Sequence, residues 1–432
     1  MTHAPNATQP TDPSHEASAT LTRQHPADLA RKPYDLVIAG GGVYGIMLTF
    51  EAARRGLRAL LLERREFGGE TSRNSLRIVH GGLRYLQTLD FKRFREHVTE
   101  RRWFMRHFPD LVRPLACLMP LYGEGVFRVP FFRPVLAFND LLSSDRNRGV
   151  PRIAHLPGSR TITAAEVTQA FPSVRPEGLE GGIVWHDGFI TDVSRLFAEA
   201  LAQAHSVGAD ALNHVEAKGL VVEAGRVVGV EALDCETGEP VTFNTDTVIN
   251  ACGPWSQHFA QRCGLAASGL FEPALTWNVV FDRPWTLGCA VAVRPKAKGG
   301  RFYFLVPWEG RLLAGTGQAP WSGDADHVTL AGEHLDAFIA DLNRAVPALA
   351  LRRDEAATVM AGLLPVERPG SSNLANREMI IDHGNRGGPS GAFSVSGVKL
   401  TTARLVAERV LGQAFPRAVV RDETHRPGRK SP

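Results

Sequence analysis

YDLVIAGGGVYGIMLTFEAARRGLRALLLE, residues 34–63, contains two apolar runs typical of strands, 36–39 and 59–62, which flank a segment with helical periodicity. Gly40, Gly42 and Gly45 follow the first run at the positions of a G-x-G-x-x-G turn. The order strand, glycine turn, helix and strand predicts an α/β protein that begins with a Rossmann-like βαβ unit.

Each part of this unit has a chemical role in binding a dinucleotide. Gly40 permits a tight turn, Gly42 lets a pyrophosphate approach the backbone, and Gly45 lets the helix pack on the strand. The helix N-terminus offers unpaired N–H groups to phosphate. Glu63 ends the second strand, where a carboxylate accepts hydrogen bonds from ribose hydroxyls and disfavours a 2′-phosphate, which argues against NADP.

The segment after Glu63 distinguishes between two cofactors. An NAD-binding domain usually continues with further βα units, whereas residues 64–86, RREFGGETSRNSLRIVHGGLRYL, are polar and glycine-rich without a helical pattern. Such an excursion suits FAD, whose ribityl and ring portion must be covered. Within it, Gly81 and Gly82 interrupt an apolar frame, which indicates that a backbone or ligand comes close.

Composition excludes several classes of protein. The net charge of +4 over 432 residues is small and spread along the chain, so we expect no nucleic-acid partner. Five separated cysteines form no metal-ligand spacing and suit a reducing, cytoplasmic location. No apolar run is long enough for a membrane span. Residues 1–33 lack a signal-peptide pattern and are expected to form a disordered leader.

Seven stretches resemble the FAD-dependent glycerol-3-phosphate dehydrogenases, within the wider class of flavoproteins similar to D-amino-acid oxidase. They are GGGVYG, LLERREFGGETSRNS, VHGGLRYL, DGFITDVSRL, INACGPWS, FLVPWEGRLLAGTG and SGVKLTTAR, and they span most of residues 34–415. The resemblance implies an FAD-binding domain with a mixed-sheet substrate domain. It also implies that the chain lacks the helical C-terminal domain common in that family.

The resemblance assigns roles to individual residues. It implies that Thr71, Ser72 and Ser75 line the cofactor, that His80, Gly81 and Gly82 pass beside the flavin, that Val215 lies near the adenine, and that Ala251 lies near the diphosphate. It places Arg84 and Tyr85 toward the substrate and matches Arg377 to a substrate-binding arginine.

The C-terminal segment 392–415 adds a further part of the expected site. A strand at 392–395 precedes Gly397 and Lys399, and a helix opens at about Thr401, with Leu400 just before it. The helix N-terminus and Lys399 both stabilise negative charge on a reduced flavin. Gly253, after the strand at 247–251, lets the chain approach the dinucleotide.

Two departures from the family pattern concern the substrate. Leu364 stands where the family has an arginine, which removes a charge-assisted contact worth about 1.5–3 kcal/mol. Arg368 is a candidate replacement four residues further on. Gly317 and Gln318 stand where the family pattern reads Thr and Asp.

The expected division of the chain is discontinuous. Residues 34–115, 191–271 and 360–415 form the FAD-binding domain, 116–190 and 272–359 form the substrate or cap domain, and 416–432 form a basic tail. Within these limits we expect a meander of strands at about 215–251, strands at about 275–281, 300–307 and 311–316, and a helix at 332–345.

A basic amphipathic segment at 92–113 has two interpretations. It carries seven Lys or Arg against three Asp or Glu and could lie on an anionic bilayer with Trp103, Phe104 and Phe108 at the interface, or pack as a core helix. The family's quinone acceptor favours the first slightly, which would place the protein at the inner face of the membrane.

The leading hypothesis is therefore oxidation of sn-glycerol 3-phosphate to dihydroxyacetone phosphate, by hydride transfer to flavin N5 and electron transfer to a quinone-like acceptor. Arg84, Arg377 and Lys399 would hold the small anionic substrate and Tyr85 would hydrogen-bond to it. His80 and His186 are candidates for the base. The alternatives are an amino-acid, amine or 2-hydroxy-acid oxidase or dehydrogenase, and a flavin-bound assembly protein without turnover.

Overall fold

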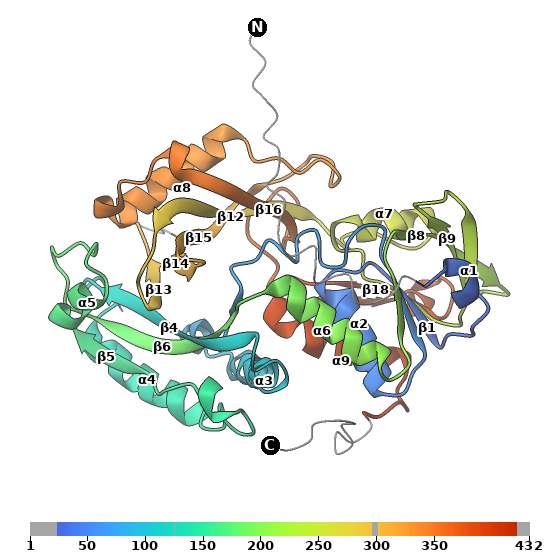
Figure 1. Ribbon diagram of the computed structural model, residues 1–432, viewed down its shortest axis with the longest axis horizontal. Coiled ribbons are helices and arrows are strands. Elements are labelled where there is room, and N and C mark those ends of the chain that lie inside the picture. Colours follow the sequence, from blue (N-terminus) through green and yellow to red (C-terminus); the bar gives the residue numbers. More distant parts are fainter. Residues whose placement is uncertain (1–23, 126, 296–300, 421–432) are drawn as a thin grey trace, which may run out of the picture.

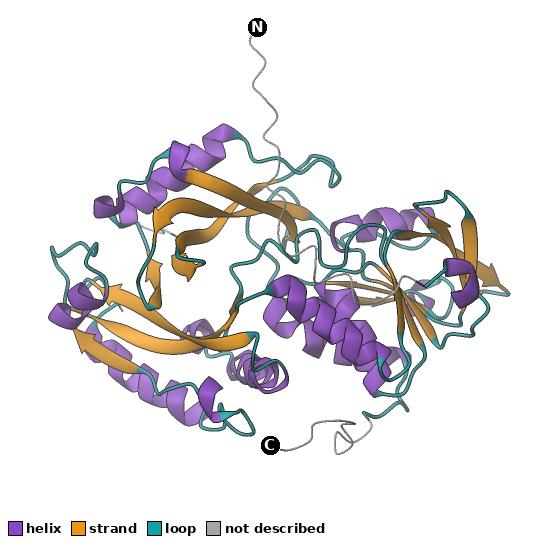
Figure 2. Cartoon of the chain, viewed as in Figure 1, coloured by secondary structure: helices purple, strands orange, loops and turns teal. Residues whose placement is uncertain are grey.

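The computed structural model describes residues 24–125, 127–295 and 301–420, which form two lobes lying side by side (Figure 1). One lobe is built on a six-stranded sheet and carries the N-terminal βαβ unit. The other is built on a nine-stranded sheet, whose strands curve strongly (Figure 2). The expected fold class is confirmed: an α/β nucleotide-binding lobe is joined to a mixed-sheet lobe.

The six-stranded sheet has the order β17-β18-β11-β1-β2-β7. Its strands are β1 (Leu36–Ala39), β2 (Ala59–Leu62), β7 (Asp210–Leu212), β11 (Val248–Asn250), β17 (Met379–Asp382) and β18 (Ala392–Ser396). All neighbours are parallel except β17 and β18. The helix α2 (Val43–Arg54) connects β1 to β2, so the βαβ prediction is confirmed.

Both faces of this sheet are covered, which explains why its strands read as continuous apolar runs. Leu36, Ile38 and Leu61 point toward α2, α6 (Val193–His205) and α9 (Ala403–Ala414). Val37 and Leu60 point the other way, toward α7 (Ser256–Arg262) and a three-stranded meander. The meander consists of β8 (Val215–Glu223), β9 (Arg226–Asp234) and β10 (Pro240–Asn244), as expected.

The nine-stranded sheet has the order β16-β12-β15-β14-β13-β4-β6-β3, with β5 also paired to β6. Its strands are β3 (Ile78–Val79), β4 (Val112–Leu121), β5 (Arg160–Thr163), β6 (Gly181–Ile190), β12 (Pro273–Pro284), β13 (Cys289–Val293), β14 (Tyr303–Trp308), β15 (Arg311–Pro320) and β16 (Ala356–Pro365). The predicted helix at 332–345 is confirmed as α8 (Gly332–Ala345), which buries Phe338 and Leu342 against this sheet.

The remaining helices are α1 (Pro26–Leu29), α3 (Phe91–His107), α4 (Val129–Leu142) and α5 (Ala164–Ala170). Short 3-10 helices are η2 (Leu83–Thr88), η3 (Arg152–Ala154), η4 (Gly253–Trp255), η5 (Pro347–Leu349), η6 (Arg353–Glu355), η7 (Gly384–Arg386) and η8 (Leu400–Thr402). The segment around Gly81 is therefore a two-residue strand followed by a helical turn, because Gly82 has a φ of +80° and ends the extended backbone.

Sheet membership departs from the expected domain boundaries at three places, and the division into domains otherwise remains a prediction. The strand β3, within the segment expected in the FAD-binding domain, pairs with β6 of the substrate-lobe sheet. The strand β16 pairs with β12, so the substrate-lobe sheet continues past residue 359 to Pro365. The strand β4 already belongs to that sheet from Val112. Long strands cross the expected limits because pairing partners, which are distant in sequence, decide where a strand ends.

The expected leader and tail fall largely outside the described residues, at 1–23 and 421–432. Within 24–33 the structure differs from the expected disorder, since α1 buries Leu29 at 2% exposure in the core around β1. An apolar side chain buried in this way orders the preceding turn.

The helix α3 corrects the expectation about the membrane interface. Phe104 and Phe108 are 0% and 1% exposed, and Trp103 packs against the same core beneath α2. The guanidinium of Arg404 lies 4.8 Å from the Trp103 ring centroid. Because these three aromatic side chains face the protein interior, α3 is a core helix and they contact no bilayer. No helix among the described residues is long and apolar enough to cross a membrane.

Candidate active site

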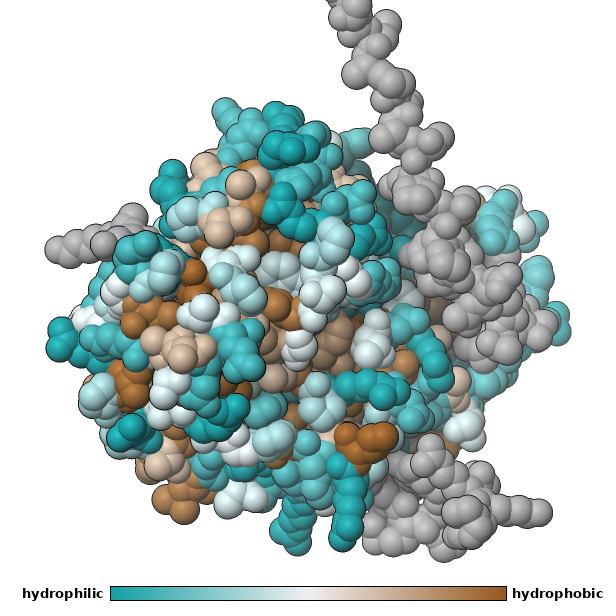
Figure 3. Space-filling model, turned by 60° about the vertical axis from the view of Figure 1, so that its left-hand side comes forward, coloured by the Kyte–Doolittle hydropathy of each residue, from teal (hydrophilic) through white to brown (hydrophobic). Residues whose placement is uncertain are grey.

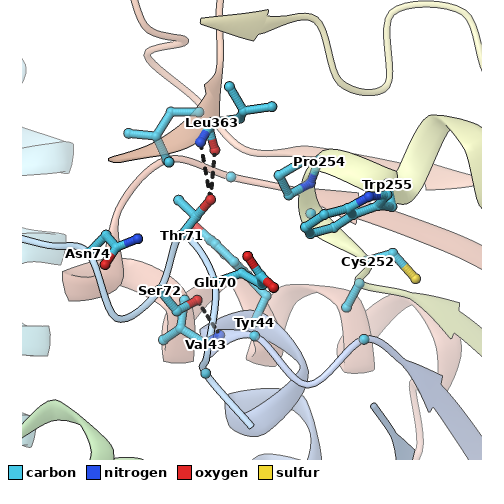
Figure 4. A pocket seen from close by; sticks show the side chains of 18 of the residues that line it. Val43, Tyr44, Glu70, Thr71, Ser72, Asn74, Cys252, Pro254, Trp255 and Leu363 are labelled. Carbon is cyan, nitrogen blue, oxygen red and sulfur yellow. Dashed lines mark hydrogen bonds between the residues drawn. The ribbon is translucent and has the colours of Figure 1, made fainter. Parts of the chain in front are cut away.

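A cavity of about 520 Å³ lies between the two lobes. Thirteen of the expected site residues line it, and they come from three separate segments of the chain, 40–80, 251–253 and 397–401: Gly40, Gly42, Glu63, Thr71, Ser72, Ser75, His80, Ala251, Gly253, Gly397, Lys399, Leu400 and Thr401. Figure 4 shows how the loop at 70–74, η4 and β16 enclose one part of it. The structure thus brings together segments up to 361 residues apart in sequence, from Gly40 to Thr401.

The glycine turn is tightly packed against its neighbours. A Cβ on Gly45 would lie 1.9 Å from the carbonyl oxygen of Gly40, and Gly40 itself has a φ of +102°. A Cβ on Gly40 would lie 2.7 Å from the carbonyl oxygen of Ala251 on the neighbouring strand. Gly45 therefore does not line the cavity; it lets α2 pack directly on the turn.

Glu63 shapes the turn from the end of β2. Its two carboxylate oxygens accept hydrogen bonds from the backbone N–H groups of Gly41 and Arg65, each at 2.7 Å. Burial raises the pKa of Glu63, and these N–H donors partly offset the effect. The carboxylate is held in one orientation at the edge of the cavity, as a ribose-binding group requires.

The loop that follows β2 joins the two lobes. Thr71 Oγ1 exchanges hydrogen bonds with the backbone of Leu363 at 3.2 and 3.3 Å (Figure 4). Asn74 Nδ2 donates to the carbonyl of Ala361 at 2.6 Å. Ser72 Oγ accepts from the N–H of Val43 at 2.9 Å, so the hydroxyl lies at the N-terminus of α2. This loop forms the cavity wall that a long dinucleotide needs.

Lys399 lies where the large cavity meets a smaller hollow. Tyr44, Val398 and Lys399 line both, while Tyr85 and Arg377 line only the hollow. The ammonium of Lys399 donates to Tyr85 Oη. Burial, followed by the charges of Arg84 and Arg93, lowers the pKa of Lys399 to about 7, with Glu378 acting in the opposite direction. Cationic groups thus converge on one end of the cavity.

His80 reaches the same cavity from the strand end after β3. Its Nδ1 lies 3.9 Å from Asp187 Oδ2, and its side chain is 42% exposed. Asp187 is buried and accepts from Gly81 N at 2.6 Å, Arg101 Nη1 at 2.7 Å and Trp185 Nε1 at 3.0 Å. Burial alone would raise the pKa of Asp187, but His80 and Arg101 hold it well below its usual range.

Several residues occupy places other than those expected. The space beside Gly81, which we assigned to the flavin, is filled by Arg101, since a Cβ there would lie 2.0 Å from Arg101 Nη1. Beside Gly82 a Cβ would lie 3.0 Å from His97 Cβ. Neither glycine lines the cavity. The glycine pair instead lets the chain turn closely over α3.

Other expected substrate and cofactor residues lie outside the large cavity. Arg84 is exposed, with its guanidinium 5.2 Å from the Tyr85 ring centroid. Val215 is fully buried, and its N–H donates to the carbonyl of Glu63 at 2.8 Å. His186 lies on a separate small hollow, beside Arg101 and Asp187. Arg368 is exposed and does not line the cavity, whereas Leu364 does.

Sequence patterns missed several polar residues of the site. Asp187 begins the DGFITDVSRL stretch, and an acid within an apolar strand was the available signal. Asn278 and Thr316, unlike Asp187, line the cavity itself: Asn278 Oδ1 accepts from Thr316 Oγ1 at 3.0 Å, and Asn278 Nδ2 donates to the carbonyl of Asn74 at 2.7 Å. These contacts depend on pairing between β12 and β15, which no local sequence motif predicts.

The residues present fit a flavin dinucleotide. The glycine turn leaves no Cβ beside the N-terminus of α2, Glu63 ends β2, and the wall continues from there past Ser72 and Ala251 to Lys399 and Thr401. An NAD-binding crevice would end near the turn, whereas this cavity continues into the second lobe. The fold and cavity therefore define a Rossmann-type flavoprotein whose substrate lobe covers the cofactor.

Comparisons with known proteins identify the family. Residues 35–410 match the family described as "FAD dependent oxidoreductase". The chain therefore belongs to that family and is an FAD-dependent enzyme. A glycerol-3-phosphate dehydrogenase of Synechocystis sp. is 31% identical over 407 residues, covering 90% of this chain and 71% of the relative. An aerobic glycerol-3-phosphate dehydrogenase of Bacillus subtilis is 28% identical over 420 residues, covering 96% and 72%.

A solved structure agrees with the fold. The glycerol-3-phosphate dehydrogenase from Bacillus halodurans, complexed with FAD, superposes with a TM-score of 0.69 at 23% identity and covers 92% of this chain and 68% of that one. This similarity supports the flavoprotein architecture of both lobes. The expected resemblance and the FAD cofactor are thus confirmed.

Replacing Gly45 with alanine should prevent normal packing of α2. Because the added Cβ would lie 1.9 Å from the Gly40 carbonyl oxygen, we expect a loss of about 1–3 kcal/mol in unfolding free energy and weak retention of FAD. Urea unfolding and visible flavin absorbance after gel filtration measure both effects. Gly412→Ala is the matched control, because no atom lies within 4 Å of its Cβ and helical alanine should stabilise α9 by about 0.5–1 kcal/mol. Full flavin content in Gly45→Ala would contradict the role of this contact.

Proposed function

We propose that the protein oxidises a secondary alcohol bearing an anionic group, most simply sn-glycerol 3-phosphate, to the corresponding ketone, dihydroxyacetone phosphate. The observation that carries this proposal is Lys399, whose half-buried side chain lies at the junction of the large cavity and the smaller hollow. The names of the sequence relatives as glycerol-3-phosphate dehydrogenases support the same substrate.

The anionic group is bound by Lys399, with Arg377 and Arg93 behind it in the hollow. Tyr85 is buried at 5% exposure, and its hydroxyl orients the ammonium that it contacts. Arg84 contributes positive potential from outside. Fixing one end of a small substrate in this way reduces its freedom to rotate and directs the carbinol carbon toward the cavity.

His80 accepts the proton of the substrate hydroxyl in this mechanism. It is exposed to the cavity, whereas His186 lies on another hollow, so the geometry favours His80 among the two candidates. Asp187 is a positioning residue, because its negative charge 3.9 Å from Nδ1 favours the protonated imidazole that forms. Bound FAD supplies the two-electron acceptor for the hydride that leaves carbon.

Leu364 bears on whether the anionic group of the substrate is a phosphate or a carboxylate. It lines the cavity on β16 without a charge, and Arg368 does not replace it. A carboxylate needs fewer cationic contacts than a phosphate dianion, which favours a 2-hydroxy acid or amino acid as the second candidate substrate. Both candidates use Lys399 for the anionic group.

The proposed electron acceptor is a quinone, reached at a membrane surface. The helix α4 supports this location, because its Phe131, Phe138 and Leu141 are 47%, 41% and 68% exposed. The ring of Phe138 contacts that of Phe91, itself 42% exposed, at a centroid distance of 5.7 Å. We name these four side chains the α4 surface. Apolar side chains appear brown among teal ones on the face drawn in Figure 3.

The charges around the α4 surface suit an anionic bilayer. Lys92, Arg128, Arg133 and Arg148 are exposed. The neighbouring acidic side chains are paired with arginines: Asp140 with Arg146, and Asp145 with both Arg95 and Arg102. An exposed apolar helix with an outward cationic rim is the arrangement of interfacial helices that attach proteins to anionic lipid.

Anaerobic titration with glycerol 3-phosphate tests the proposed substrate. Flavin absorbance should be lost on addition of the compound, and Lys399→Met should need at least about tenfold more of it, since a lost charge-assisted contact is worth roughly 1.5–3 kcal/mol. Amino acids and 2-hydroxy acids are assayed in parallel. Bleaching by one of those classes, with none by glycerol 3-phosphate, would overturn the leading substrate.

Substrate affinity should depend on pH through Lys399. Its pKa is lowered to about 7, so the ammonium is present below that pH and is lost above it. The dissociation constant of a three-carbon sulfonate, whose own charge is fixed, should be constant in acid and rise by up to about tenfold per pH unit above 7. Lys399→Arg should flatten this rise, because arginine stays charged. The exposed Lys218 provides the control Lys218→Arg, and identical profiles for Lys399→Arg and the parent would refute the assignment.

Vesicle sedimentation tests the membrane contact. The protein should pellet with vesicles containing phosphatidylglycerol, and the triple variant Phe131→Ser, Phe138→Ser, Leu141→Ser should bind at least about tenfold more weakly, at roughly 1.5 kcal/mol per buried apolar side chain. The matched control is Val207→Ser, Val222→Ser, Val419→Ser, whose side chains are exposed elsewhere. Equal sedimentation of the two triple variants would exclude the α4 surface as the contact.

A further inference from the structure

A loop of the substrate lobe crosses to the nucleotide-binding lobe at the end of the cavity that Glu63 lines. It comprises residues 321–331, between β15 and α8, and it extends toward α7 in Figure 1. At its tip Asp326 lines the cavity together with Glu63 and Trp255. The loop is therefore part of the wall at the ribose-binding end.

Asp326 accepts three hydrogen bonds from the opposite lobe. Its Oδ1 accepts from Arg64 Nη2, from Arg65 Nη2 at 3.3 Å and from Trp255 Nε1 at 3.1 Å. Arg64 also stacks over the Trp255 ring at 4.3 Å from its centroid. We call this set of contacts the Asp326 clasp. Its donors come from the end of β2 and from η4, which are the elements that surround the dinucleotide turn.

The clasp is more than a single surface ion pair. Exposed pairs contribute only about 0–1 kcal/mol each. Here one carboxylate accepts from two guanidinium groups and an indole, and one of the guanidinium groups, that of Arg64, also stacks on the indole. Asp326 is 36% exposed and Arg64 26%, so water still reaches both side chains. The clasp is thus stable enough to remain formed, while solvent access lets its hydrogen bonds break and re-form.

Other contacts keep the lobes together when the clasp opens. Thr71 bonds to Leu363, Asn74 to Ala361 and Asn278 to Asn74, all nearer the centre of the cavity. Breaking the bonds to Asp326 would therefore release only the loop at 321–331. Such a local opening exposes the cavity beside Glu63 while the rest of the site stays assembled.

From this arrangement we infer that the Asp326 clasp closes the adenosine end of the cavity and controls the rate at which FAD leaves the protein. Glu63, which fits the ribose, directly precedes Arg64 and Arg65 in sequence, so the donors of the clasp and the ribose contact lie on one short segment. Opening requires three hydrogen bonds to break together, and two of them join opposite charges. FAD release should accelerate with ionic strength for this reason.

The test measures FAD release by the rise in flavin fluorescence after strong dilution of the holoenzyme into flavin-free buffer, without any substrate. Asp326→Ala should release FAD at least about tenfold faster than the parent and lose the dependence on salt. Asp336→Ala is the matched control, because Asp336 also pairs with an arginine, Arg353, at 3.0 Å, but both residues belong to the substrate lobe. Its release rate should equal that of the parent.

A second variant separates closure from folding. Trp255→Phe keeps the ring under Arg64 and removes only the N–H donor, so FAD release should accelerate about threefold with an unchanged circular dichroism spectrum. Parental release rates in Asp326→Ala and Trp255→Phe would overturn the inference. Equal acceleration in Asp336→Ala would also overturn it, since the effect would then be general destabilisation. Because no substrate enters the assay, its outcome is independent of the proposed reaction.

Discussion

The contact between Gly45 and the carbonyl oxygen of Gly40 is the constraint on which the rest of the site depends. With no side chain at Gly45, α2 lies directly on the turn after β1, where a Cβ would come within 1.9 Å of that oxygen. The N-terminus of α2 then reaches Ser72, and Glu63 reaches the N–H of Gly41. The same turn approaches Ala251 on β11. Three segments distant in sequence are therefore held around one backbone turn.

A buried ionic cluster fixes the other end of the cavity. Arg404 on α9 donates to Glu100 on α3 at 3.0 Å and to Glu51 on α2 at 3.3 Å. A buried charge left without its partner costs about 3–5 kcal/mol, so the three helices keep one relative position. Since Lys399 precedes Arg404 by five residues, the cluster also determines where the ammonium enters the cavity. Tyr44 adds hydrogen bonds of 3.3 Å to the backbone of Lys399.

The sequence predicted those parts of the molecule whose signals are local. The βαβ unit, the meander and α8 follow from periodicity and turn residues within short windows, and the cavity contains most of the residues taken from motifs. The sequence singled out the glycine pair at Gly81, but it did not predict which side chains surround that pair in the structure. Arg101 from α3 fills the space beside Gly81, and Asp187 from β6 accepts a hydrogen bond from the Gly81 N–H. Tertiary packing determines both contacts. Amphipathicity likewise could not tell α3, which is buried, from α4, which carries the exposed aromatic rings.

The same distinction separates the redox chemistry from the choice of substrate. FAD binding needs a backbone turn, a helix N-terminus and one carboxylate, all of which a short sequence specifies. In the function proposed above, substrate recognition instead needs charges from separate elements to meet, as Lys399, Arg377 and Arg93 do from the segment before α9, the loop before β17 and α3. At such a meeting point one replacement, here Leu364 on β16, alters the number of charges without altering the fold. Under this proposal, a flavoprotein of this architecture changes substrate through a few side chains where the two lobes meet, while the glycine turn and the cofactor stay the same.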